Sequence, residues 1–310
     1  MIHRSRESSL EFWISVRDSH DLPSASRLAA MIPSQVHRLR ILRIRAPMAF
    51  IDCQVAVLRE LSAPRMTRLY LHNITQETNR GSPPPLQRIF TGGVPRLSHF
   101  EVLGFDSRIR PPLASVKTLS IGSYTHAASH PAHLTLREAA LTTHELYIQI
   151  MPGALSTFVV IQMPSLKYLR ISAPYLEVVT LLGLLEAATL EDLYLHSPNV
   201  GPLTPRSHAV PNSTVGKYSA LRSLTLRGAL GNDILRAFPT INQLRILDDS
   251  DYPLQLENIF NPNQDAILTL APRLASITAP PGYKETIQAF ITARQSLGIN
   301  VTLFIAASGM

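Results

Sequence analysis

Residues 163–172 read MPSLKYLRIS and place Leu166, Leu169 and Ile171 at the three apolar positions of an LxxLxL pattern. The last two of these positions flank an arginine, an alternation typical of a strand that buries one face. The pattern recurs along the chain, and in THELYI its first position is occupied by Thr143. The units begin at residues 39, 66, 97, 116, 143, 166, 190, 221, 241 and 274. This recurrence predicts a repeat architecture with one strand in each unit.

The distance between units supports the same interpretation. The starts are about 26 residues apart on average, within the length range of leucine-rich repeats, although individual distances vary widely. Prolines precede the first apolar position by two residues in five units, at Pro64, Pro95, Pro164, Pro239 and Pro272. Because proline ends helices and favours extended backbone before it, we expect these residues to separate a helix from the next strand. The alternative is an α/β globule in which the spacing recurs by chance.

Helical periodicity lies between several of the predicted strands. Ile51, Val55 and Leu58 follow the i, i+4, i+7 spacing of one helix face, and apolar residues between 178 and 185 do the same. Near the C-terminus, residues 283–298 read as a helix that ends at Gly298, before the predicted strand 301–305. Repeated strand and helix units favour parallel strands that share one continuous core.

We therefore predict an α/β fold, a leucine-rich-repeat-like solenoid with parallel strands on its concave face and helices on its convex face. One domain is expected over residues 1–310, with about ten irregular repeats from 39 to 279. An N-terminal cap over 9–38 and a helix–strand cap over 283–305 complete it.

Four segments resemble the divergent leucine-rich repeats of F-box proteins, particularly those of mushroom-forming fungi. They are APRMTRLYLHN (63–73), VPRLSHFEVLGF (94–105), MPSLKYLRISAP (163–174) and APRLASITAP (271–280), and the resemblance extends from about residue 9 to residue 305. In that family an F-box recruits the Skp1 adaptor of a ubiquitin ligase, and the repeats capture the protein to be modified. The resemblance thus implies a substrate-recognition module that binds protein.

Two features depart from that family. Ordinary leucine-rich repeats carry Asn or Cys eight residues after the first apolar position, where this chain has Pro47, Ile74, Phe105, Tyr124, Pro174 and Pro198. Near the start, Leu22-Pro23 lacks the following Glu and the apolar pattern of an F-box. Either the chain is a fragment or a shortened gene product, or it binds without recruiting a ligase. Skp1 is expected as a partner only if an F-box exists outside this chain.

The predicted strands point alternate side chains away from the core, and these outward positions are rich in Tyr and Arg. Tyr and Arg often anchor protein interfaces, because they combine large area with a polar tip. A plain preference of Tyr for exposed strands is the competing explanation. The predicted contacts with a protein partner are Arg43, Tyr70, Tyr147, Tyr168, Arg170, Tyr194 and Arg245.

Composition limits the class of protein. With 45% hydrophobic and 16% charged residues, the chain can bury a large core. Its single cysteine, Cys53, excludes an internal disulfide and is expected in the core or at the boundary of an amphipathic helix. Because the basic start lacks a signal-peptide core and no apolar run reaches bilayer length, we expect an intracellular protein, cytoplasmic or nuclear, with no membrane partner.

The net charge of +7 favours acidic partners. The densest basic stretch, HRLRILRIR, has arginines at 38, 40, 43 and 45 that do not form one continuous cluster along a phosphate backbone, and an RNA-binding signature is missing. Nucleic acid is therefore an unlikely partner. A structural or nucleic-acid-binding solenoid with no ubiquitin-ligase link remains the alternative function.

Motifs for catalysis or metal binding are weak. His126, His130 and His133 have helical spacing, but Pro131 interrupts it. The sequence has neither a second His after His144 for a zinc protease, nor a phosphate-binding GxxxxGK loop, nor a GxSxG elbow. We expect no enzyme, cofactor or metal. Three long connections, 74–86, 196–219 and 248–265, read as loops whose role stays open.

Overall fold

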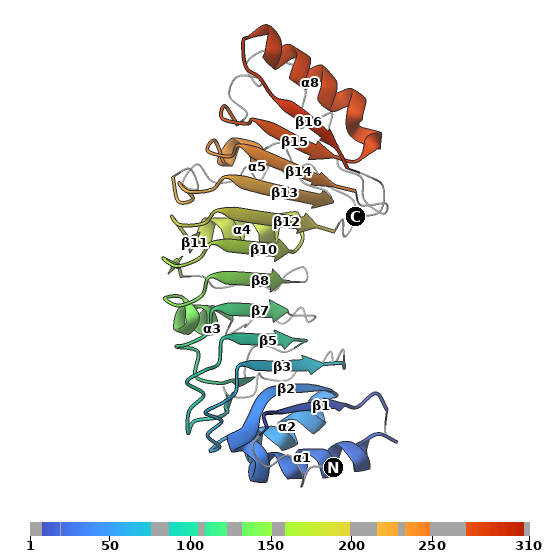
Figure 1. Cartoon of the computed structure of the whole chain (residues 1–310), viewed down its shortest axis with the longest axis vertical. Coiled ribbons are helices and arrows are strands. Elements are labelled where there is room, and N and C mark those ends of the chain that lie inside the picture. The colour runs from blue at the N-terminus through green and yellow to red at the C-terminus, as the bar shows by residue number, and fades with distance from the viewer. Residues whose placement is uncertain are drawn as a thin grey trace. The chain divides into compact units, whose positions relative to one another are not determined.

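The structure is a computed structural model of the whole chain. It describes residues 8–18, 20–75, 87–104, 109–122, 132–150, 159–198, 216–228, 233–248 and 271–306. In these ranges twelve strands form one parallel sheet, in the order β1-β2-β3-β5-β7-β8-β10-β12-β13-β14-β15-β16, which is not closed into a barrel (Figure 1). The predicted α/β class and the parallel strands are therefore confirmed.

The chain divides into two compact units, Met1–Phe158 and Val159–Met310. The first contains β1 (Leu10–Ser15), β2 (Leu39–Ala46), β3 (Arg68–Asn73), β5 (His99–Leu103), β7 (Thr118–Gly122) and β8 (Glu145–Gln149). The second contains β10 (Tyr168–Ser172), β12 (Asp192–Ser197), β13 (Ser223–Gly228), β14 (Gln243–Leu247), β15 (Ser276–Ala279) and β16 (Thr302–Ile305). A single domain over 1–310 stays a prediction.

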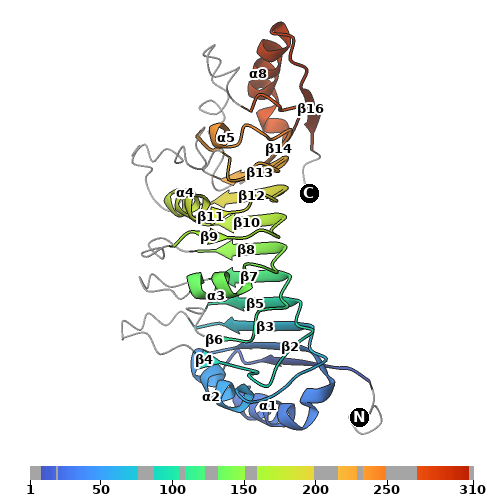
Figure 2. The same cartoon turned by 90° about the vertical axis from the view of Figure 1, so that its left-hand side faces the viewer.

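Helices occupy several of the connections between strands. They are α1 (Leu22–Gln35), α2 (Met48–Leu58), α3 (Ala132–Ala139), α4 (Tyr175–Leu184), α5 (Asp233–Ala237) and α8 (Lys284–Ser296), with single 3-10 turns at Val36–Arg38 and Pro281–Tyr283. In the first unit α1 contacts β1 and α2 contacts β2, and in the second α4 contacts β12 (Figure 2). Gly298, at φ +79°, follows α8 as expected. None of the described helices is long and apolar enough to cross a bilayer.

The residues that the LxxLxL pattern marks as apolar all lie in the core. All three positions are buried in each of the ten units, including Leu166, Leu169 and Ile171 at 0% exposure. Thr143, the one polar residue among them, is also fully buried, and its hydroxyl donates a 2.8 Å hydrogen bond to the carbonyl of Ala139. A hydroxyl that bonds to the nearby backbone is tolerated at an apolar position, since the polar group is satisfied.

A four-residue turn precedes the strand in most units. The N–H of the first apolar residue donates to the carbonyl three residues earlier, for example from Met66 to Ala63 at 3.1 Å and from Leu97 to Val94 at 3.0 Å. The five prolines of the sequence pattern therefore occupy the second position of this turn, where their fixed φ is favourable. The same bond starts at Val116, Leu166, Leu190, Leu221, Ile241 and Leu274.

Other observations differ from the expectations or fall outside the described ranges. Cys53 is exposed on α2, so its predicted core or boundary position is wrong. Two short parallel ladders were not anticipated: β4 (Gln87–Arg88) with β6 (Ile109–Arg110), and β9 (Ile161–Gln162) with β11 (Leu185–Glu186). Most of the connections 74–86, 196–219 and 248–265, together with His126 and His130, lies outside the described residues.

Candidate functional site

One face of each sheet segment carries the residues that alternate with the buried positions, and we call it the polar face. In the first unit, cross-strand register joins a central row on this face: Trp13, Arg43, Tyr70, Glu101, Ser120 and Tyr147. In the second unit the corresponding row is Arg170, Tyr194, Thr225, Arg245, Thr278 and Phe304. These rows contain all the predicted contact residues except Tyr168, which lies on β10 directly opposite Asp192.

Arg43 lies between two aromatic rings in the first unit. Its guanidinium carbon is 4.3 Å from the ring centroid of Tyr70 and 4.9 Å from that of Trp13. Tyr70 is 8% exposed, whereas Trp13 is 64% exposed. Cation–π contact on both sides holds the arginine in place and leaves a large indole surface free for a partner.

A charged hydrogen-bond network lies next to this stack. His72 Nε2 donates to Glu101 Oε1 over 2.6 Å, and His99 Nε2 is 3.7 Å from Glu101 Oε2. The hydrogen bond from His72, and then the nearby His99, lower the pKa of Glu101 to about 2. The rings of His99 and Tyr70 are 5.0 Å apart, so the network is continuous with the arginine stack.

The second unit repeats part of this arrangement. Arg170 stands directly opposite Tyr194 in the strand register, and its guanidinium carbon is 4.3 Å from the tyrosine ring. Tyr194 is 9% exposed, while Arg170 is exposed. Two residues further along, the hydroxyl of Ser172 and Nδ1 of His196 are 3.0 Å apart. Each unit thus places an arginine on a tyrosine that belongs to a Leu-Tyr-Leu-His sequence.

The predicted residues fall into three groups by exposure. Arg170 and Arg245 are exposed, whereas Arg43, Tyr147 and Tyr168 are half-buried. Tyr70 and Tyr194 point to the polar face but are nearly covered, so they act chiefly as supports for the arginines. The arginines and Trp13, which the strand prediction missed, offer more accessible surface than these two tyrosines.

The polar face can bind through stacking, charge and hydrogen bonds. In the described part of the chain, His, Cys, Asp and Glu side chains nowhere gather in a group of three or more suited to a metal ion. Comparisons of the chain with protein-family models, curated proteins and solved structures found no match.

Proposed function

We propose that this chain is a leucine-rich-repeat-like solenoid that binds a protein partner on the polar face of its sheet. The observation that carries the proposal is the pair of arginine–tyrosine stacks, Arg43 on Tyr70 and Arg170 on Tyr194. A stacked guanidinium loses less conformational freedom on binding than a free one, and arginine is frequent among the residues that dominate binding energy. The exposed ring of Trp13 adds a second such anchor in the first unit.

The resemblance to F-box repeats suggests the class of partner. On this proposal the chain captures a protein substrate for a ubiquitin ligase inside the cell, in the cytoplasm or nucleus. Contact with Skp1 requires an F-box outside this chain. The module needs neither catalysis nor cofactor, because its role is recognition.

Two variants of the full chain test the proposed face. We expect the double change R170Q and R245Q to lower capture of partner proteins about tenfold, since both exposed arginines lose charge and their forked donors. The matched control, R137Q and R236Q, removes the same charge from exposed positions on α3 and α5. Capture from lysate of the source cells, quantified by mass spectrometry with Skp1 and cullin peptides included, gives the readout.

Equal capture by both double variants would reject the polar face. Recovery of Skp1 would support a ligase link, whereas another enriched protein without Skp1 would support a stand-alone binding module. The rival is a structural or nucleic-acid-binding solenoid, favoured by the net charge of +7. RNA affinity that falls steeply with added salt would support that rival.

A further inference from the structure

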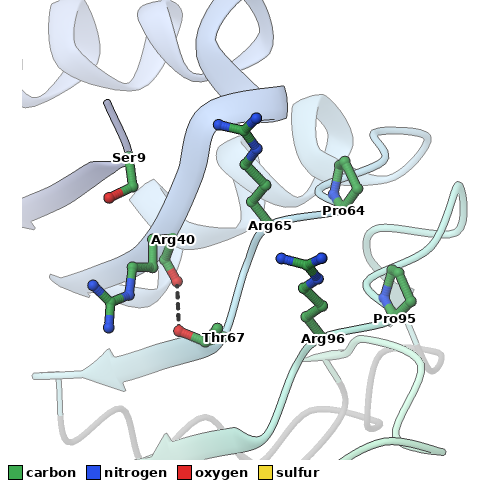
Figure 3. A pocket seen from close by; sticks show the side chains of 7 residues that line it. All are labelled: Ser9, Arg40, Pro64, Arg65, Thr67, Pro95 and Arg96. Atoms are coloured by element: carbon green, nitrogen blue, oxygen red, sulfur yellow. Dashed lines mark hydrogen bonds between the residues drawn. The ribbon is translucent and has the colours of Figure 1, made fainter. Parts of the chain in front are cut away.

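A cavity of about 710 Å³ lies where strands β2, β3 and β5 of the first unit begin (Figure 3). Three arginines (Arg40, Arg65 and Arg96), two prolines (Pro64 and Pro95), Thr67 and Ser9 line it. Its volume is within the range of about 300–1,000 Å³ that is usual for pockets that bind small ligands. The cavity shares no lining residue with the central row of the polar face.

Two of the arginines are placed by the same backbone turn in successive units. Arg65 follows Pro64 in the turn Ala63–Met66, and Arg96 follows Pro95 in the turn Val94–Leu97. The strands that these turns start, β3 and β5, are hydrogen-bonded neighbours, so equivalent residues lie about 5 Å apart. In Figure 3 the two side chains run in the same direction from the two turns.

Arg40 lines the cavity beside a β-bulge, and in Figure 3 its side chain extends away from those of Arg65 and Arg96. On β1, Leu10 pairs with Leu39 but Glu11 pairs with Ile41, so Arg40 is the extra residue on β2. Its carbonyl accepts hydrogen bonds from the Thr67 N–H at 2.8 Å and from the Thr67 hydroxyl at 3.3 Å. A bulge redirects side chains locally, and here the neighbouring turn anchors it.

Acidic side chains of the described residues do not neutralise the three guanidinium groups. All three arginines are exposed, and the lining contains no carboxylate. Within the described residues, none of the three forms an ion pair with Asp or Glu. The cavity therefore concentrates positive charge that an anion can complement.

We propose that this cavity binds a phosphate monoester. A monoester carries nearly two negative charges and three acceptor oxygens, which the forked donors of Arg65 and Arg96 can match with the positive charge of Arg40 nearby, whereas a carboxylate carries one charge and two oxygens. The rings of Pro64 and Pro95 supply apolar surface for the organic part of the ester. The ester is either a small molecule or a phosphorylated side chain of another protein, and the two sources share this chemistry.

Titration calorimetry of the full chain distinguishes the sources. The probes are O-phosphoserine, a short phosphoserine peptide, its unphosphorylated twin and a single-stranded RNA of similar length. We expect both phosphorylated probes to bind at least tenfold more tightly than the twin. Tighter binding of the peptide than of O-phosphoserine identifies a phosphorylated protein as the source, and equal binding identifies a small ester. Failure of both phosphorylated probes to bind, or tighter binding of RNA, overturns the proposal.

Matched turn variants locate the binding. R65Q and R96Q should each weaken phosphoserine binding about tenfold or more, since a hydrogen bond to a charged group contributes at least that factor. R273Q changes an exposed arginine in the equivalent Pro-Arg turn of the second unit and should leave affinity unchanged. If R65Q and R96Q bind as tightly as R273Q, the site is refuted. Each variant's melting temperature is measured beforehand, because the exposed positions should leave folding intact.

Phosphoserine binding in the cavity does not depend on the proposed protein-binding face. The R170Q and R245Q double variant should bind O-phosphoserine as the wild type does. If that variant loses phosphoserine binding while R65Q and R96Q keep it, the anion lies on the polar face and the cavity is refuted.

Discussion

Glu101 is an acidic residue that a hydrogen-bond network keeps charged on the polar face. Half-buried on the polar face, it accepts a hydrogen bond from His72 and lies close to His99, and both lower its pKa to about 2. Sequence alone could not predict this network, because the three residues come from two strands whose register only the folded sheet defines. The LxxLxL pattern does predict that their side chains leave the core.

The lowered pKa of Glu101 gives a pH-dependent contribution to stability. The folded state holds the proton less tightly than the unfolded state, so the contribution is complete above about pH 4.5 and is lost as pH falls toward 2. Its upper limit is about 3 kcal/mol in the free energy of unfolding. Urea unfolding at about pH 5.5 and about pH 2.5 should show a larger loss for the wild type than for E101Q. Equal losses for the two proteins would contradict this role of Glu101.

The turn before each strand is the element that the sequence marks most plainly. Pro64 and Pro95 sit at its second position, and the equivalent turn Ala187–Leu190 has Ala188 there. In the described residues the Ala188 N–H donates no hydrogen bond, so a proline would remove none. Proline at a compatible position reduces the freedom of the unfolded chain.

We therefore expect A188P to raise the free energy of unfolding by about 0.4–1 kcal/mol and P95A to lower it by a similar amount. Chemical denaturation of both variants beside the wild type measures the two changes. A destabilised A188P would mean that the backbone of this turn differs from that of the proline-containing turns. The P95A variant serves as the control in the opposite direction.

At the scale of elements, sequence reasoning succeeded where periodicity is long enough to read. Helix α2 contains one confirmed and one wrong prediction. Ile51, Val55 and Leu58 are buried, as the i, i+4, i+7 spacing predicts. Cys53 is two residues from Ile51, about 200° around the helix, and therefore faces solvent. The helical period alone therefore places Cys53 on the side of α2 opposite to Ile51.

Other elements are too short to show a periodicity in the sequence, or lie outside the repeated pattern. The ladders β4–β6 and β9–β11 are two residues long, and no period can be read from so short a run. Phe12, Ile14 and Val16 alternate in burial along β1, but this strand lies outside the LxxLxL units, so the pattern does not lead to Trp13. The sequence also does not predict the cavity, because the position of Arg40 depends on a bulge that breaks the regular register.

Asn73 shows how an irregular repeat can still supply hydrogen bonds to backbone groups at the end of its strand. The asparagine expected eight residues after the first apolar position is replaced there by Ile74, but Asn73, seven residues after Met66, is buried. Its amide donates to the Gly104 carbonyl at 2.9 Å, and its Oδ1 accepts from the Thr75 N–H at 3.0 Å. The bond to Gly104 joins the end of β3 to the end of β5, so a displaced residue links neighbouring units.

At the scale of the whole molecule, the strands described for the twelve-stranded sheet follow one another in chain order, so stability should be transmitted locally. In the second unit, Leu224 is fully buried in β13 between β12 and β14. We expect L224A to cost about 2–5 kcal/mol, from lost apolar contact and the cavity left behind. Hydrogen exchange with mass spectrometry should show the largest loss of protection in β12, β13 and β14. Leu42, equally buried in β2, provides the matched substitution in the first unit.

The two substitutions together separate local from global unfolding. If L42A mainly weakens protection of β1, β2 and β3 while L224A mainly weakens β12, β13 and β14, opening occurs in groups of neighbouring strands. Uniform loss of protection across all the strands in both variants would instead mean that the chain opens as one cooperative block. The local outcome also matters for binding, because a partner on the polar face of one unit would then protect the neighbouring strands of that unit most strongly.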